Sequence, residues 1–141
     1  MTRRANSVYG CSEIRTPNID KLAQSGVRFT NAFAAAPVCP PSRMTWATGL
    51  MPCSHGVQDW LILKDSTGQG SRGWLGPNLT WFEVLKRGGY RLGMTGKWHM
   101  GFDEKAQRGF SYWATVPGGG GTYRNPEFVV NGKRRRYEGF K

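Results

Sequence analysis

Four side chains of this sequence, Cys39, Arg43, Lys97 and His99, are of types that can act together on an anionic ester. A cysteine is a nucleophile or the precursor of one, and a histidine can move a proton at neutral pH. Arginine and lysine supply the positive charge that stabilises an anionic transition state. The set suggests transfer of a negatively charged group, provided that the fold brings the two segments together.

Cys39 is expected on a turn that leads into a helix. Residues 37–41 are rich in proline, whereas residues 42–48 contain neither proline nor glycine and stop at Gly49. This pattern predicts a short helix that begins just past Cys39. Because a helix N-terminus carries partial positive charge, an anion beside residue 39 would be favoured.

Lys97 and His99 are expected at the C-terminal end of a strand. Residues 80–83 form a capping box that opens a helix, the glycine pair at 88–89 ends it, and residues 90–95 then read as a strand. Two residues apart on an extended chain, Lys97 and His99 should point to the same side. In open α/β sheets, sites are built at this edge.

The remaining segments favour an α/β fold over a helical bundle or a β sandwich. We predict a helix over about residues 17–25, a short strand over 27–34 and a surface loop over 64–78. A further strand is predicted over 127–130, followed by an Asn131-Gly132 turn. Helices and strands thus mix along the chain.

The net charge of +11, from 20 Lys and Arg against 9 Asp and Glu, favours anionic partners. We read the cluster at 133–136 as a solvated turn, and a second basic group lies at Arg3 and Arg4. No stretch is long and apolar enough for a membrane span, and no nucleic-acid motif is present. We therefore expect neither a membrane nor a nucleic acid as a partner.

Of the three cysteines, Cys11 and Cys53 are expected to be small buried side chains.

Two stretches carry a family resemblance. Residues 39–49 read Cys-Pro-Pro-Ser-Arg-Met-Thr-Trp-Ala-Thr-Gly, and residues 89–101 read Gly-Tyr-Arg-Leu-Gly-Met-Thr-Gly-Lys-Trp-His-Met-Gly. In this order they resemble the two signatures of the type I sulfatases. Residues 16–22 and 26–32 resemble the stretch that these enzymes carry before the first signature. The resemblance spans about residues 7–132.

The resemblance implies a fold and a chemistry. The fold would be part of an alkaline-phosphatase-like mixed sheet flanked by helices. A maturation enzyme would oxidise Cys39 to a formylglycine, whose hydrate attacks the sulfur of a sulfated small molecule or glycan. Arg43 would hold the modified residue and its charge, Lys97 would contact the sulfate, and His99 would contact the hydrated aldehyde or assist proton transfer.

Two further site features follow only from the resemblance. His55, in Ser-His-Gly-Val, falls where many sulfatases have His-Gly-Val, so it either binds substrate or is structural. The family binds calcium, or magnesium, through oxygen ligands, and modified Cys39 would be one of them. The paired acidic residues that supply most of the other ligands are missing here. The resemblance leaves the compartment open, and for a full-length parent it suggests the periplasm or secretion.

We therefore expect residues 1–141 to be the N-terminal portion of a sulfatase catalytic domain, without the first strand and the C-terminal part, and to be inactive alone. Three alternatives stay open. One is a phosphonate or phosphate monoester hydrolase of the same superfamily, and another is a nonenzymatic module that binds anions. The third is a cysteine hydrolase in which His55 or His99 is the base for an unmodified Cys39.

Overall fold

The computed structural model describes residues 6–140 of the 141-residue chain. The basic pair at Arg3 and Arg4 therefore lies outside the described residues. The chain divides into two compact units, Met1–Phe33 and Ala34–Lys141. All the candidate site residues belong to the second unit.

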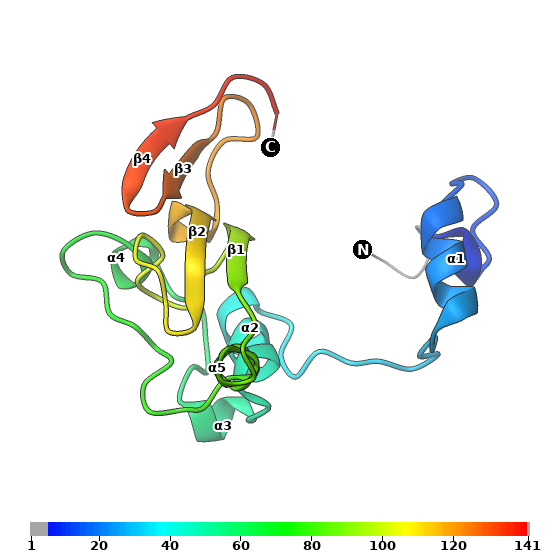
Figure 1. Cartoon of the computed structure of the whole chain (residues 1–141), viewed down its shortest axis with the longest axis horizontal. Helices are drawn as coiled ribbons and strands as arrows, with labels where there is room; N and C mark the ends of the chain where they lie inside the picture. The colour runs from blue at the N-terminus through cyan, green and yellow to red at the C-terminus, as the bar shows by residue number, and fades with distance from the viewer. Residues whose placement is uncertain (1–5, 141) are drawn as a thin grey trace. The chain divides into compact units, whose positions relative to one another are not determined.

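The first unit holds a 3-10 turn, η2 (Ser7–Tyr9), and a helix, α1 (Pro17–Ser25), as labelled in Figure 1. The helix confirms the prediction over residues 17–25. The Ser7 hydroxyl lies 2.7 Å from the Thr16 hydroxyl and donates to the Asp20 carboxylate at 2.6 Å. These bonds tie the start of α1 to the turn that precedes it.

The strand predicted over residues 27–34 is wrong, because this segment has no regular structure. Val27, Phe29 and Phe33 are 80%, 68% and 90% exposed. A strand is stable only when its backbone groups pair with a neighbour. Within residues 6–140 no strand pairs with this segment. The alternation of apolar and polar residues was therefore not enough to make it a strand.

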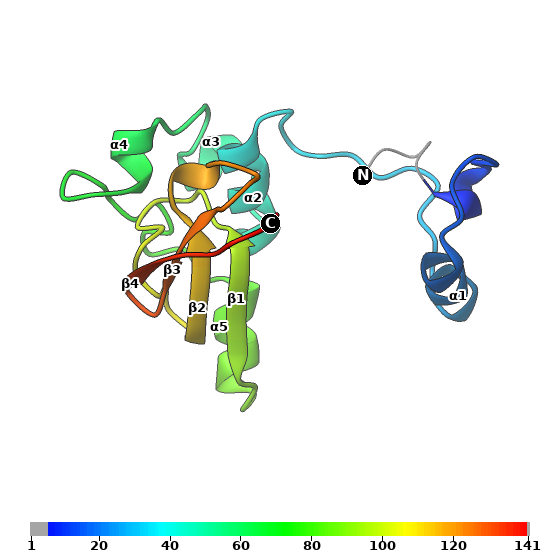
Figure 2. The ribbon, with the colours of Figure 1, turned by 90° about the horizontal axis from the view of Figure 1, so that it is seen from above.

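The second unit is built on a mixed four-stranded sheet, which confirms the α/β prediction. Its strands are β1 (Leu92–Lys97), β2 (Phe110–Val116), β3 (Glu127–Val130) and β4 (Lys133–Arg136), in that spatial order. β1 and β2 are parallel, and the other pairs are antiparallel. Figures 1 and 2 show β1 and β2 side by side with the β3–β4 hairpin beyond β2.

The hairpin confirms the predicted strand over residues 127–130 and the predicted turn. Asn131 and Gly132 both have positive φ angles, 47° and 81°, as a tight two-residue hairpin requires. The interpretation of residues 133–136 as a turn is wrong, since they form β4, although every side chain in it is exposed. Arg134 is tied down there by ion pairs with Glu104 and Glu127.

Four helical segments accompany the sheet: α2 (Cys39–Thr48), α3 (Pro52–His55), α4 (Leu63–Ser66) and α5 (Trp81–Arg87). The predicted capping box is present, because Thr80 accepts from the Glu83 amide while the Glu83 carboxylate accepts from the Thr80 amide. The loop predicted over residues 64–78 is interrupted by the single turn of α4. No helix within residues 6–140 has the length and apolarity needed to cross a membrane.

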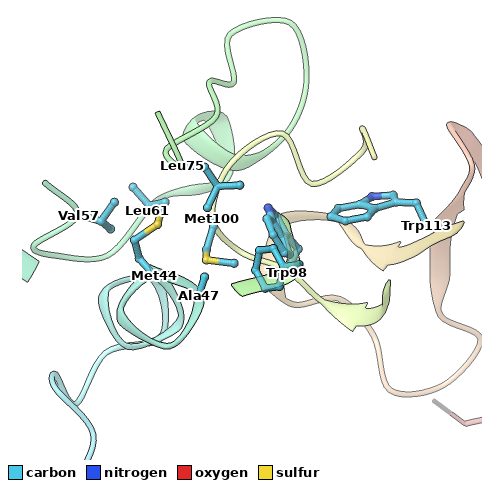
Figure 3. Packing of buried hydrophobic residues seen from close by; sticks show 9 residues of the cluster. Met44, Ala47, Val57, Leu61, Leu75, Trp98, Met100 and Trp113 are labelled. Carbon is cyan, nitrogen blue, oxygen red and sulfur yellow. The ribbon is translucent and has the colours of Figure 1, made fainter. Parts of the chain in front are cut away.

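The core lies where α2, α5 and the connecting segments pack against the sheet, and Figure 3 shows its side chains. Its buried members are Met44, Ala47, Val57, Leu61, Leu75, Phe82, Trp98, Met100 and Trp113. Trp98 and Met100 flank His99 in the sequence and are only 1% and 2% exposed. Because both neighbours are fixed in the core, the backbone at His99 is held firmly in place.

Candidate active site

Cys39 is the first residue of α2, so the helix predicted past it is confirmed but the expectation that Cys39 itself lies on a turn is wrong. Its side chain is half-buried and its thiol is free. Pro40 and Pro41 occupy the rest of the first turn and are buried, and proline has no N–H. This helix end therefore offers an anion fewer amide donors than a usual N-terminus, so side chains must supply most of the positive charge.

Arg43 joins the two segments that the sequence singled out. It lies four residues after Cys39, so both lie on the same face of α2. Its Nη1 donates a hydrogen bond of 2.7 Å to the backbone carbonyl of Lys97. The guanidinium thereby fixes the start of α2 to the C-terminal end of β1.

Lys97 is the last residue of β1, and its ammonium lies beside an aromatic ring. The Nζ atom is 5.7 Å from the centroid of the Trp60 ring, within the range of a cation–π interaction. In the part of the chain that is described, no carboxylate forms an ion pair with Lys97. Its charge is thus available to an anion.

His99 is completely buried and does not continue the strand, so the expectation that it shares one side of an extended chain with Lys97 is wrong. Its φ angle is +57°, in the left-handed region that few residues other than glycine adopt. The chain turns there because Trp98 enters the core and its indole N–H donates to the Gly101 carbonyl at 3.0 Å.

The hydrogen bonds of His99 define its tautomer. Its Nε2 lies 3.0 Å from the Leu61 carbonyl, which can only accept, so Nε2 carries the proton. Its Nδ1 is buried and has no hydrogen-bond partner among residues 6–140. The ring packs edge-to-face on Trp60, with centroids 4.7 Å apart.

Burial lowers the pKa of His99, because removing the ring from water penalises its charged form. The hydrogen bond to Leu61 raises the pKa in part, whereas the charges of Lys97 and Arg43 lower it further. The ring is therefore neutral at physiological pH. Its Nδ1 lone pair can accept a hydrogen bond or a proton.

His55 lies at the end of α3 and is buried. Its Nε2 lies 3.1 Å from the Thr45 hydroxyl, and its Nδ1 accepts from the Val57 amide at 3.2 Å. Both ring nitrogens are thus used to tie α2 to the turn after α3, which favours the structural interpretation. Burial lowers the pKa of His55 as well.

The cysteine-hydrolase alternative finds no support in this arrangement. Within residues 6–140 no hydrogen bond joins the Cys39 thiol to His55 or His99. The Nε2 of each histidine is directed to another partner. The expectation that Cys11 and Cys53 are buried is wrong, since Cys53 is exposed and Cys11 is half-buried.

Residues 6–140 do not by themselves fit the calcium or magnesium ion that the resemblance implies. No group of three or more His, Cys, Asp or Glu side chains gathers among them. Cys39 would be a single ligand, and a hard cation needs six or more oxygen atoms.

Two residues that the sequence did not single out lie near Lys97 and His99. Trp60 is 51% exposed and touches both side chains. Asp103 is completely buried four residues after His99. An isolated tryptophan or aspartate has no sequence signal for such a place, because only the fold brings the segments together.

A cavity of about 370 Å³ opens beside Arg43 and Lys97. Its other walls are mostly apolar and include Trp46, Trp81 and Phe110. Neither Cys39 nor His99 lines this cavity.

Comparison with known proteins indicates a family. Residues 2–136 match the family model described as Sulfatase. The chain is 39% identical over 122 residues to arylsulfatase H of Homo sapiens, covering 79% of this chain and 22% of that protein. It is 33% identical over 141 residues to N-acetylglucosamine-6-O-sulfatase of Bacteroides thetaiotaomicron, covering 99% of this chain and 23% of that protein.

Solved structures agree as well. One, a complex with its substrate D-glucosamine-2-N,6-O-disulfate, has a TM-score of 0.78 and 33% identity. The match covers 99% of this chain and 26% of that one. The chain thus spans about a quarter of the proteins that it matches.

Proposed function

The chain belongs to the sulfatase family, and we propose that its protein hydrolyses sulfate esters with a formylglycine made from Cys39. The observation that carries the proposal is the hydrogen bond from Arg43 to the carbonyl of Lys97. It joins the segment that contains the modifiable cysteine to the segment that contains Lys97 and His99. A maturation enzyme would read the Cys-Pro-Pro-Ser-Arg run at residues 39–43.

Conversion of Cys39 to formylglycine would replace its thiol with a hydrated aldehyde, whose hydroxyl is the nucleophile. A hydrated formylglycine at position 39 offers one hydroxyl to attack sulfur, with loss of the alcohol, and a second whose deprotonation expels sulfate and restores the aldehyde. Splitting the displacement in this way replaces one difficult step with two easier ones.

The other three side chains divide the remaining work. Lys97 binds a sulfate oxygen, because no described carboxylate neutralises its ammonium. Arg43 compensates the negative charge next to residue 39 while its Nη1 holds the Lys97 carbonyl. Neutral His99 accepts a proton or a hydrogen bond at Nδ1 from a hydroxyl of the hydrated residue.

We propose a sulfated carbohydrate as the substrate, with an aryl or steryl sulfate as the second choice. The relative from Bacteroides thetaiotaomicron, whose name specifies a sugar sulfate, and the structure solved with a disulfated glucosamine support the first choice. The net charge of +11 favours a substrate with more than one negative group.

The test is release of sulfate from a sulfated N-acetylglucosamine by the whole protein that contains residues 1–141, matured with a formylglycine-generating enzyme, because these residues are expected to be inactive alone. Cys39→Ala is the matched control, because it cannot be converted. We expect release that depends on Cys39 and exceeds phosphate release from the corresponding phosphate ester. Preference for the phosphate ester would indicate a phosphate hydrolase. Binding of the sugar without turnover would indicate an anion-binding module.

A further inference from the structure

Asp103 is a buried carboxylate that the proposed reaction does not use. Its side chain is 0% exposed, and neither carboxylate oxygen has a hydrogen-bond partner of regular geometry within the described residues. Burying an ionisable group without a full set of partners costs stability. A carboxylate kept in such a place calls for an explanation.

The backbone of Asp103 is fixed from three directions. Its N–H donates to the Ser66 carbonyl at 2.9 Å. Its carbonyl accepts from the Trp113 indole N–H at 2.8 Å and also from the Thr115 hydroxyl. With the main chain held by a helical turn and by β2, the side chain has little freedom to leave its position.

Three backbone N–H groups around His99 act on the Asp103 carboxylate without forming hydrogen bonds of regular geometry with it. They are those of His99, Gly118 and Gly119, and they favour the charged carboxylate. Burial acts more strongly in the opposite direction and raises the pKa of Asp103 to about 6, and Glu104 adds to the rise. At neutral pH the carboxylate is therefore mostly charged and attracts these three amides.

The glycine turn that Asp103 attracts packs directly against the histidine ring. A Cβ atom at Gly119 would lie 2.4 Å from Cγ and 2.5 Å from Nδ1 of His99. Only the absence of a side chain lets the turn approach so closely. The position of this turn thus limits where the ring, and in particular Nδ1, can lie.

We propose that Asp103 is a positioning residue for His99. Its carboxylate holds the left-handed backbone of His99 and the turn at 118–119 together, so that Nε2 stays on the Leu61 carbonyl and Nδ1 remains an acceptor. The use of that acceptor in catalysis rests on the proposed function. The positioning itself does not, and it can be measured without turnover.

The first test is nitrogen NMR of the two histidine rings in the isotopically labelled wild-type protein and in Asp103→Asn. The variant keeps the shape of the side chain and removes its charge. We expect His99 to lose its uniform Nε2–H tautomer, and its ring N–H to exchange with water roughly tenfold faster or more. His55 is the internal control, because its partners are Thr45 and Val57, and its signals should not change. An unchanged His99 ring beside an unchanged His55 would overturn the proposal.

The second test needs only the wild-type protein and covers the case in which the variant does not fold. Because the three amides act on the Asp103 carboxylate through its charge, the amide NMR signals of His99, Gly118 and Gly119 should shift as Asp103 ionises, with a midpoint at about pH 6. Absence of such a pH-dependent shift at all three amides would overturn the proposal. Sulfate release that fails while both NMR results hold would count against the proposed function alone.

Discussion

The Arg43 guanidinium donates a 2.7 Å hydrogen bond to the backbone carbonyl of Lys97, across 54 positions of sequence. Arg43 thereby links two segments. It lies one helical turn after Cys39, and it binds the end of the strand that contains Lys97. Hydrogen bonds from a charged donor are stronger than neutral ones. The relative position of Cys39 and Lys97 thus depends on the planar shape of this side chain.

Arg43→Lys should therefore reduce kcat strongly in the matured protein. Lysine keeps the charge but lacks the planar set of N–H donors with which a guanidinium can bind a carbonyl and an anion at the same time. We expect a loss on the order of 10²–10³-fold in kcat, as for other donors directed at a transition state. Arg87→Lys, at the exposed end of α5, is the matched control. Activity of Arg43→Lys within about twofold of that control would contradict the assigned role.

Trp60→Leu should weaken the site without unfolding the protein. The ring supports both the Lys97 ammonium and the His99 ring while half of its surface is exposed. A cation–π contact contributes about 0.5–2 kcal/mol, so we expect kcat/KM to fall roughly tenfold. The neighbouring exposed residue gives the control, Ile62→Leu, which should retain wild-type kinetics.

Asp103 should change how stability depends on pH. Its folded-state pKa of about 6 lies above its ordinary value of 3.8. Its favourable contribution is thus complete below pH 3.8 and is lost as the pH rises through about 6. Urea unfolding of Asp103→Asn and wild type should show the variant gaining relative stability between pH 5 and pH 8, by about 1–1.5 kcal/mol. A difference that does not vary with pH would refute this.

His99 should change the pH dependence of stability in the opposite direction to Asp103. Because its folded-state pKa is lowered from 6.5, its contribution is present at higher pH and is lost as the pH falls below 6.5 towards the folded value. His99→Gln keeps a hydrogen-bonding side chain but cannot titrate. Its unfolding free energy should fall less than that of wild type between pH 7.5 and pH 5. An equally steep fall in the two proteins would show that the buried ring is not the cause.

The capping box should stabilise α5 independently of the chemistry. Thr80 is 1% exposed and caps the Glu83 amide at 3.3 Å. Thr80→Ala should lower the free energy of unfolding by about 1 kcal/mol, and at most about 2. Thr122→Ala, at an exposed position, should change it by less than about 0.5 kcal/mol. Equal effects of the two substitutions in thermal unfolding would argue against the cap.

Local signals in the sequence predicted the local structure well. The capping box at 80–83 and the Asn131-Gly132 turn each depend on residues within one turn of chain, so their types suffice. The strand predicted over 27–34 was wrong because pairing is a long-range property. For the same reason β2 was not predicted, since Phe110–Val116 is a strand only beside β1.

The chemistry of the site was predicted from a resemblance, and its geometry was not. The signatures indicated Arg43, Lys97 and His99, but not the hydrogen bond that joins the first two. The left-handed backbone of His99 lies between two buried side chains, Trp98 and Met100, and no spacing of residues reveals it. Trp60 and Asp103 were missed because each reaches the site through the fold alone.

Peptide mass spectrometry tests the central claim most directly. The protein is expressed with a formylglycine-generating enzyme, and the tryptic peptide of residues 29–43, which contains Cys39, is analysed. We predict the mass of the aldehyde in place of the thiol, trapped by a hydrazide, in the wild-type protein and not in Pro41→Ala. A peptide that keeps its thiol throughout, beside a control sulfatase that is converted, would contradict the proposed chemistry of Cys39.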